Sequence, residues 1–141
     1  MLNLKTRGVS PIAYFNVLGA NGEPQLGEDG RPCRIRYHSP ASREYAEAQA
    51  IAQNAVVDML KTDGSTSQSA DEKLERQAEF LAAITIEFEN WCYIVDGEEA
   101  PRPGKEQFLA AFRDRSIGYV PEKFQAHAAK WGNASKPSPT S

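Results

Sequence analysis

The chain of 141 residues has few cysteines and no long apolar segment. Two cysteines, Cys33 and Cys92, are too few for a disulfide framework and are typical of a protein in a reducing cytosol. No stretch approaches the roughly 18 consecutive apolar residues that a membrane span requires. The first seven residues contain no apolar core of signal-peptide length, so we expect no secretion and no membrane partner.

Positive charge is scarce as well. The 16 lysines and arginines are outnumbered by 19 acidic residues, and the net charge is −3. Binding to nucleic-acid phosphates requires clustered basic residues, so we expect no nucleic-acid partner. Arg34 and Arg36, with Lys5 and Arg7 nearby in sequence, could still form a basic patch; charges that protect an edge strand are the simpler interpretation.

Motifs for catalysis and for metal binding are missing. The sequence contains no P-loop, no dinucleotide-binding glycine motif and no nucleophile elbow. Cys33 and His38 are predicted on opposite faces of a strand, and Cys92 and His127 have no metal-ligand spacing. We therefore expect a protein that is not an enzyme and that has no catalytic residue, no cofactor and no metal site.

The first forty residues are predicted to form a β-ribbon. Residues 12–18 are rich in aromatic and β-branched side chains, and residues 34–38 alternate between apolar and polar. Asn-Gly and Asp-Gly pairs at 21–22 and 29–30 suit turns with positive φ. A hairpin follows from this pattern, with a short third strand near 25–26 as an option.

The rest of the chain predicts helices. Apolar residues at three- and four-residue spacing, with capping signals at Ser39 and Ser69, indicate four helices near 40–61, 69–91, 104–114 and 121–131. The β-branched stretch 84–88 also resembles a strand, but its 3.6-residue period favours helix. The predicted core contains one apolar residue or more from each of the last three helices: Leu81, Ile84, Phe88, Phe108, Phe112 and Phe124.

The predicted fold class is therefore α+β and mainly α, with a ribbon of two or three strands packed on about four helices. Residues 1–132 are expected to form one globular domain, made of the ribbon at 1–38 and a helical part at 39–132. Residues 133–141 are rich in serine and proline and are predicted to be a disordered tail.

The order of these elements resembles that of the tail assembly chaperones of long-tailed bacteriophages. The resemblance extends over roughly residues 13–133 and is carried by the segments VLGANGEP (17–24), GRPCRI (30–35), SREY (42–45), LAAITIEFENW (81–91), DGEEAP (96–101), SIGYV (116–120) and AKWGN (129–133). The segment that ends in Asn90 and Trp91 and the connector with Tyr119 are the most specific parts.

The resemblance implies a non-catalytic protein that binds and solubilises the tape-measure protein and helps to recruit tail-tube subunits. It also implies an oligomer that acts in the host cytoplasm and is absent from the mature virion. Many members of the family are also made in a longer form by ribosomal frameshifting. A structural or joining protein of the phage particle is the alternative function, and a small cytosolic regulator or enzyme is a weaker one.

The C-terminal half holds more large aromatic residues than short helices readily bury. Most of them are expected in the core, and the rest in a partner-binding surface. Four large residues lie at or beyond predicted helix ends, where a small core covers them least: Trp91, Tyr93, Ile94 and Tyr119. They are the predicted partner-binding residues, and closure of the core is the other interpretation of the same four.

Overall fold

The computed structural model describes residues 1–63 and 69–134, without the side chains of Met59 and residues 61–63. Its elements in chain order are η1 (Leu4–Arg7), β1 (Ile12–Asn16), β2 (Arg34–His38), α1 (Arg43–Asp63), α2 (Ala70–Ile84), β3 (Thr85–Glu89), α3 (Gly104–Arg113), η2 (Arg115–Ile117), α4 (Tyr119–Ala128) and η3 (Trp131–Ala134), where η denotes a 3-10 helix. The predicted α+β class is confirmed.

The three strands form one antiparallel sheet in the order β1-β2-β3. The predicted hairpin of β1 and β2 is present, with Phe15 opposite Ile35 and Ala13 opposite Tyr37. These four side chains are buried and their neighbours in sequence point to the other face, as period-2 alternation requires. Residues 25–26 form no third strand, because the loop there contains only isolated bridges such as Leu26 to Pro32.

The third strand instead is β3, which corrects the prediction of a helix through residue 91. Helix α2 ends at Ile84, and Thr85 takes extended backbone angles while its hydroxyl donates to the Leu81 carbonyl at 2.7 Å. The β-branched residues that follow pair with β2, which places Glu87 opposite Arg36 and Glu89 opposite Arg34. This long-range pairing of charges and backbone overrides the local helical period.

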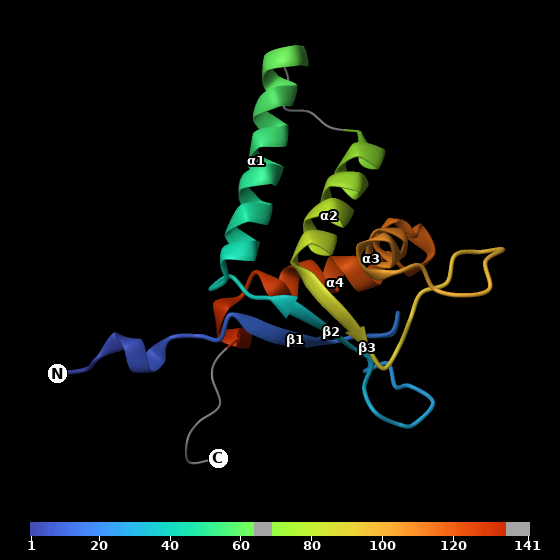
Figure 1. Cartoon of the computed structure of the whole chain (residues 1–141), viewed down its shortest axis with the longest axis horizontal. Coiled ribbons are helices and arrows are strands. Elements are labelled where there is room, and N and C mark those ends of the chain that lie inside the picture. Colours follow the sequence, from blue (N-terminus) through green and yellow to red (C-terminus); the bar gives the residue numbers. More distant parts are fainter. Residues whose placement is uncertain (64–68, 135–141) are drawn as a thin grey trace.

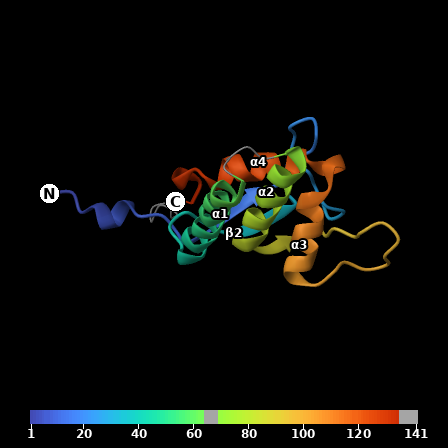
Figure 2. The same ribbon diagram turned by 90° about the horizontal axis from the view of Figure 1, so that it is seen from above.

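Helices cover one face of the sheet (Figure 1). The Phe124 ring of α4 lies 5.5 Å from the Phe15 ring and 5.2 Å from the Tyr37 ring, while α3 contributes Phe108 and Phe112 against Phe88 of β3. The six predicted core residues are all buried, which confirms that prediction. Figure 2 shows α1, α2 and α3 following one another across the molecule, so α2 is the middle helix.

Two other helix limits differ from the prediction. Helix α1 begins at Arg43 because Ser42, and not Ser39, accepts the Tyr45 amide proton as the N-cap. Helix α4 begins at Tyr119, two residues before Pro121; a proline in the first turn costs little because its missing N–H would have no helical partner. The helix ends at Ala128, so Trp131 falls in η3 and is 58% exposed.

The chain after α4 packs against the start of β1. Ala134 is buried, and its carbonyl accepts a hydrogen bond from the Ser10 amide at 2.7 Å. The packed chain thus continues at least two residues past the expected limit at 132, and residues 135–141 of the predicted tail lie outside the described residues. Within the described part, none of the helices combines the length and the apolarity needed to cross a membrane.

Candidate functional site

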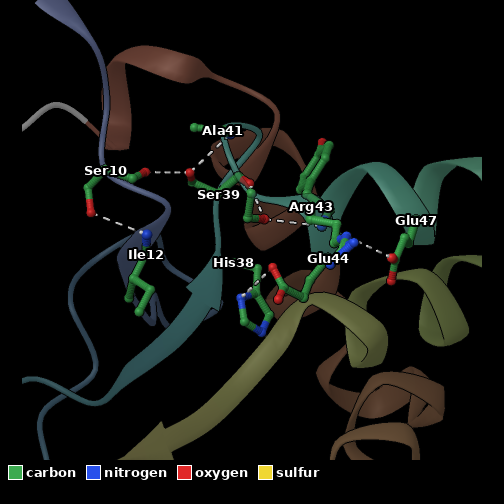
Figure 3. Close-up of polar contacts among 10 residues, drawn as sticks. Ser10, Ile12, His38, Ser39, Ala41, Arg43, Glu44 and Glu47 are labelled. Carbon is green, nitrogen blue, oxygen red and sulfur yellow. Dashed lines mark hydrogen bonds and ion pairs between the residues drawn. The ribbon is translucent and has the colours of Figure 1, made fainter.

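Helix α1 is held firmly at its first turn (Figure 3). The Ser39 hydroxyl donates to the Ser10 carbonyl at 2.5 Å and accepts the Ala41 amide at 3.2 Å. The Ser42 hydroxyl donates to the Ser39 carbonyl at 2.6 Å, and the His38 ring lies 3.6 Å from the Glu44 carboxylate. These contacts fasten the beginning of α1 to the end of β2 and to the segment before β1.

Beyond that base, α1 has little support. With 21 residues it is about 31 Å long, and among its side chains that the structure describes only Tyr45 and Ala48, both in the first half, are buried. Tyr45 meets Phe80 of α2 edge to face, with ring centroids 5.4 Å apart. Farther along, large aliphatic side chains lie in solvent: Ile51 is 69% exposed and Leu60 is 47% exposed.

A groove of about 680 Å³ runs between α1 and α2, and the side of α4 closes its base. We name it the α1–α2 groove. It is lined by side chains of three helices, namely Tyr45, Gln49, Ala52, Gln53 and Val56 of α1, Lys73, Leu74, Arg76, Gln77 and Phe80 of α2, and Gln125 and Ala129 of α4. Figure 1 shows the three helices in this arrangement, with α4 crossing below the other two.

The lining combines apolar side chains with neutral amides. Four glutamines contribute, and one of them, Gln77, donates from its amide to Gln125 at 2.7 Å, which ties α2 to α4. No carboxylate is among the lining residues, whereas Lys73 and Arg76 are both cations. The α1–α2 groove is thus apolar and positively charged in a chain whose net charge is negative.

Arg76 stands out among the lining residues because it has no partner. Its Nε is buried and forms no hydrogen bond, and within the described part of the chain Arg76 belongs to no ion pair. A buried donor without a partner costs about 1–3 kcal/mol. Neighbouring arginines differ: Arg113 binds Glu75 with its Nε at 2.8 Å, and Arg115 binds Asp71.

A second, smaller groove of about 260 Å³ lies on the other flank of α1. Ile51 and Ala55 of α1 line one side of it, and Leu109 of α3 lies on the opposite side. Arg76 lines both grooves, so its side chain lies in the gap between α1 and α2.

Three of the four sequence-predicted partner residues are tied into the fold. The Trp91 indole stacks on Phe88 with centroids 4.0 Å apart and donates to the Arg34 carbonyl at 2.9 Å. The Tyr93 hydroxyl donates to Asp114 at 2.6 Å, and this hydrogen bond, with the negative charge, raises the pKa of Tyr93 to about 12. Tyr119 is half-buried against the core.

Ile94 is the exposed member of this set, at 42%. It follows Tyr93 in the chain between β3 and α3, whereas Tyr119 begins α4. No ring contact joins Tyr119 to Trp91 or Tyr93 in the part of the chain that the structure describes. Trp91, Tyr93 and Tyr119 therefore each pack against the core, Ile94 is exposed, and the four residues form no single exposed aromatic surface.

The two arginines of the possible basic patch are paired with acids. Arg34 lies 2.5 Å from Glu89 and stacks over the Tyr14 ring at 4.3 Å, and Arg36 lies 3.4 Å from Glu87. Across the outer face of the sheet these pairs neutralise the basic charge. Among the described residues, no three His, Cys, Asp or Glu side chains lie close enough together to bind a metal ion.

No protein-family model, curated protein or solved structure matches this chain.

The sequence contained a signal for the α1–α2 groove that motif searching does not detect. Residues 48–57 of α1 contain no charged side chain, although half of this helix surface faces solvent. An exposed surface helix ordinarily carries charges on its polar face. The ten neutral residues of this segment depart from that pattern.

Proposed function

We propose that this protein is a non-catalytic tail assembly chaperone that binds the tape-measure protein of a long-tailed bacteriophage in the α1–α2 groove. The observation that carries the proposal is the groove itself: an open, mainly apolar channel between two helices, with exposed Ile51 and Leu60 on the less supported helix. The resemblance in the order of elements supplies the identity of the client.

The shape of the groove supports a helical client. Helix-in-groove recognition uses an amphipathic helix whose apolar stripe packs between two helices of its partner. Helix α2 gives the groove a wall about 22 Å long, which matches four turns of a bound helix. The neutral glutamines at its edges can donate or accept hydrogen bonds, so they suit clients of varied sequence.

The proposed role needs many copies that each bind weakly. A tape-measure protein is long and repeats its apolar stripe, and linked binding along one client adds through effective concentration. Recruitment of tail-tube subunits, self-association on the client and action in the host cytoplasm belong to the same proposal.

The residues predicted from the sequence, Trp91, Tyr93, Ile94 and Tyr119, are the alternative binding site for the client. Trp91 and Tyr93 are engaged inside the protein, so Ile94 provides the exposed apolar area there. The groove offers far more, and we therefore place the client in the groove and use Ile94 as the comparison site.

Co-expression with a tape-measure protein from the same genome tests the proposal. The tape-measure protein should become soluble and co-purify only when this protein is present. Leu74→Ser, which replaces a half-buried lining residue, should reduce the recovered complex several-fold. Ile94→Ser is the matched control for loss of an exposed aliphatic residue outside the groove and should leave recovery unchanged.

Thermal unfolding of both variants separates loss of binding from loss of fold. A tape-measure protein that is equally soluble with and without this protein, and never co-purifies with it, would remove the chaperone proposal. If Ile94→Ser and not Leu74→Ser abolished recovery, the client would bind at the residues predicted from the sequence and not in the groove.

A further inference from the structure

The cationic residues in the α1–α2 groove restrict which helices it accepts. We infer that the groove selects an amphipathic helix whose apolar stripe is flanked by carboxylates, and that Arg76 is the residue that recognises one of them. This inference rests on the proposed function for its client, and it adds the chemistry by which that client is recognised.

Charge complementarity is the first argument. Twelve residues line the groove, two of them cations and none of them acids. None of the acids of α2 lines the groove, and two of them are paired elsewhere, Glu75 with Arg113 and Asp71 with Arg115. A bound helix with basic residues beside its stripe would bring like charges together, whereas one with acidic residues would meet Lys73 and Arg76.

The state of Arg76 is the second argument. Its Nε is buried without a hydrogen-bond partner, whereas Arg113 of the neighbouring helix α3 binds the Glu75 carboxylate. Guanidinium groups bind carboxylates through two parallel N–H donors, which gives direction as well as strength. A client carboxylate in the groove would supply the acceptor that Arg76 lacks in the free protein.

The apolar lining of the groove strengthens the contact between Arg76 and a client carboxylate. Tyr45, Phe80 and Val56 line the groove together with Arg76, so a helix that fills the groove would displace water from around the guanidinium. An ion pair is stronger in such surroundings than at an open surface. Lys73 is exposed, so it contributes less binding free energy than Arg76 and mainly raises the association rate of acidic helices.

Two labelled helical peptides of about 18 residues, roughly five turns, provide the test. They share one leucine and alanine stripe, and flanking positions hold glutamate in one and lysine in the other. Fluorescence anisotropy with the full chain should show tighter binding of the glutamate peptide, with an advantage that shrinks as salt rises. Arg76→Gln should weaken the glutamate peptide roughly tenfold and leave the lysine peptide unchanged.

Two further variants keep the result interpretable. Gln53→Glu places a carboxylate on the exposed wall of the groove, where it cannot disturb the core, and should weaken the glutamate peptide several-fold. Lys5→Gln removes a positive charge from the exposed η1 segment, away from the groove, and should change nothing. Equal binding of the two peptides, or no effect of Arg76→Gln and Gln53→Glu, would overturn the inference.

Other results separate this inference from the proposed function. A tape-measure protein that co-purifies while neither peptide binds would refute acidic recognition and retain the chaperone. Glutamate-peptide binding that depends on Arg76, without tape-measure co-purification, would support acidic recognition and refute the phage role. A stable dimer in sedimentation that excludes both peptides and that Arg76→Gln dissociates would place a second copy in the groove, which also overturns the inference.

Discussion

Phe88→Ala removes the side chain that joins the sheet to helix α3. Phe88 is buried on β3, opposite Ile35 of β2. Its ring lies 4.0 Å from the Trp91 ring, 4.6 Å from the Phe108 ring and 5.8 Å from the Phe112 ring. The substitution therefore opens a cavity where β3 and α3 meet.

The expected loss is about 4 kcal/mol in the free energy of unfolding. Phenylalanine-to-alanine changes in cores cost roughly 3–5 kcal/mol, which includes the transfer free energy and the residual cavity. The three ring contacts of Phe88 keep the loss above the lower end of that range although the residue is 8% exposed, since each aromatic pair adds about 0.5–1.5 kcal/mol beyond its buried area. With a slope of about 2 kcal/mol per molar urea, the unfolding midpoint should fall by roughly 2 M.

Urea unfolding followed by far-ultraviolet circular dichroism measures this loss. Fluorescence serves separately as a local probe, because the Trp91 indole stacks directly on Phe88. Ile51→Ala is the control, since that side chain is 69% exposed and its loss should change stability by less than about 0.5 kcal/mol. A loss below about 1 kcal/mol for Phe88→Ala would refute the placement of Phe88 in the core and with it the packing of β3 on α3.

Three further predictions concern single contacts. A double-mutant cycle of Tyr93→Phe and Asp114→Ala, measured by urea unfolding, should give a coupling of about 0.5–1 kcal/mol, because the Tyr93 hydroxyl donates to that carboxylate; additive losses would contradict this contact. Stability should fall as the pH is lowered from about 7 to about 5, because burial lowers the pKa of His127 below its unfolded value near 6.5 and the unfolded chain therefore takes up the proton first. In the His127→Gln variant, the urea midpoint should depend less on pH across this window. Gly27→Ala should destabilise by about 1–3 kcal/mol, since the new Cβ would lie 2.5 Å from the Asn90 side-chain nitrogen, and adding Asn90→Gly should restore part of the loss in thermal unfolding.

The sequence was sufficient for the features that depend on local patterns. The alternation in residues 34–38 predicted β2, and the capping signal Ser69 predicted the start of α2, where the Ser69 hydroxyl accepts the Glu72 amide at 3.2 Å. Phe108, Phe112 and Phe124 were predictable because they lie on the apolar faces of helices that do form, whereas Phe88 was correctly predicted to be buried although it lies on a strand and not on the expected helix. Periodicity alone could not identify β3. Glu87 and Glu89 are stabilised in a strand by their pairing with Arg36 and Arg34, which lie about fifty positions earlier and which local spacing does not reveal.

The site was harder to predict for a related reason. Large aromatic residues near helix ends suggested a partner surface, yet Trp91 and Tyr93 find hydrogen-bond acceptors that are remote in sequence, the Arg34 carbonyl and Asp114. Conversely, the α1–α2 groove is built mainly from alanine, glutamine and single aliphatic residues, none of which forms a motif. Its existence depends on how far α1 extends beyond its anchored base, which is a property of the assembled fold.

The direct passage of α2 into β3 gives the two walls of the groove unequal stiffness. A rotation of α2 would have to break the pairing of β3 with β2 at the Thr85 junction, and α2 is also braced by Arg113 and Gln125. Helix α1 is anchored at its N-terminal end by the hydrogen bonds of Ser39 and Ser42, so the same force displaces its residues farther the more distant they are from that end. Under the proposed function, a client with bulky side chains would be accommodated at the far end of the groove by bending of α1, while α2 and the base keep the register of binding.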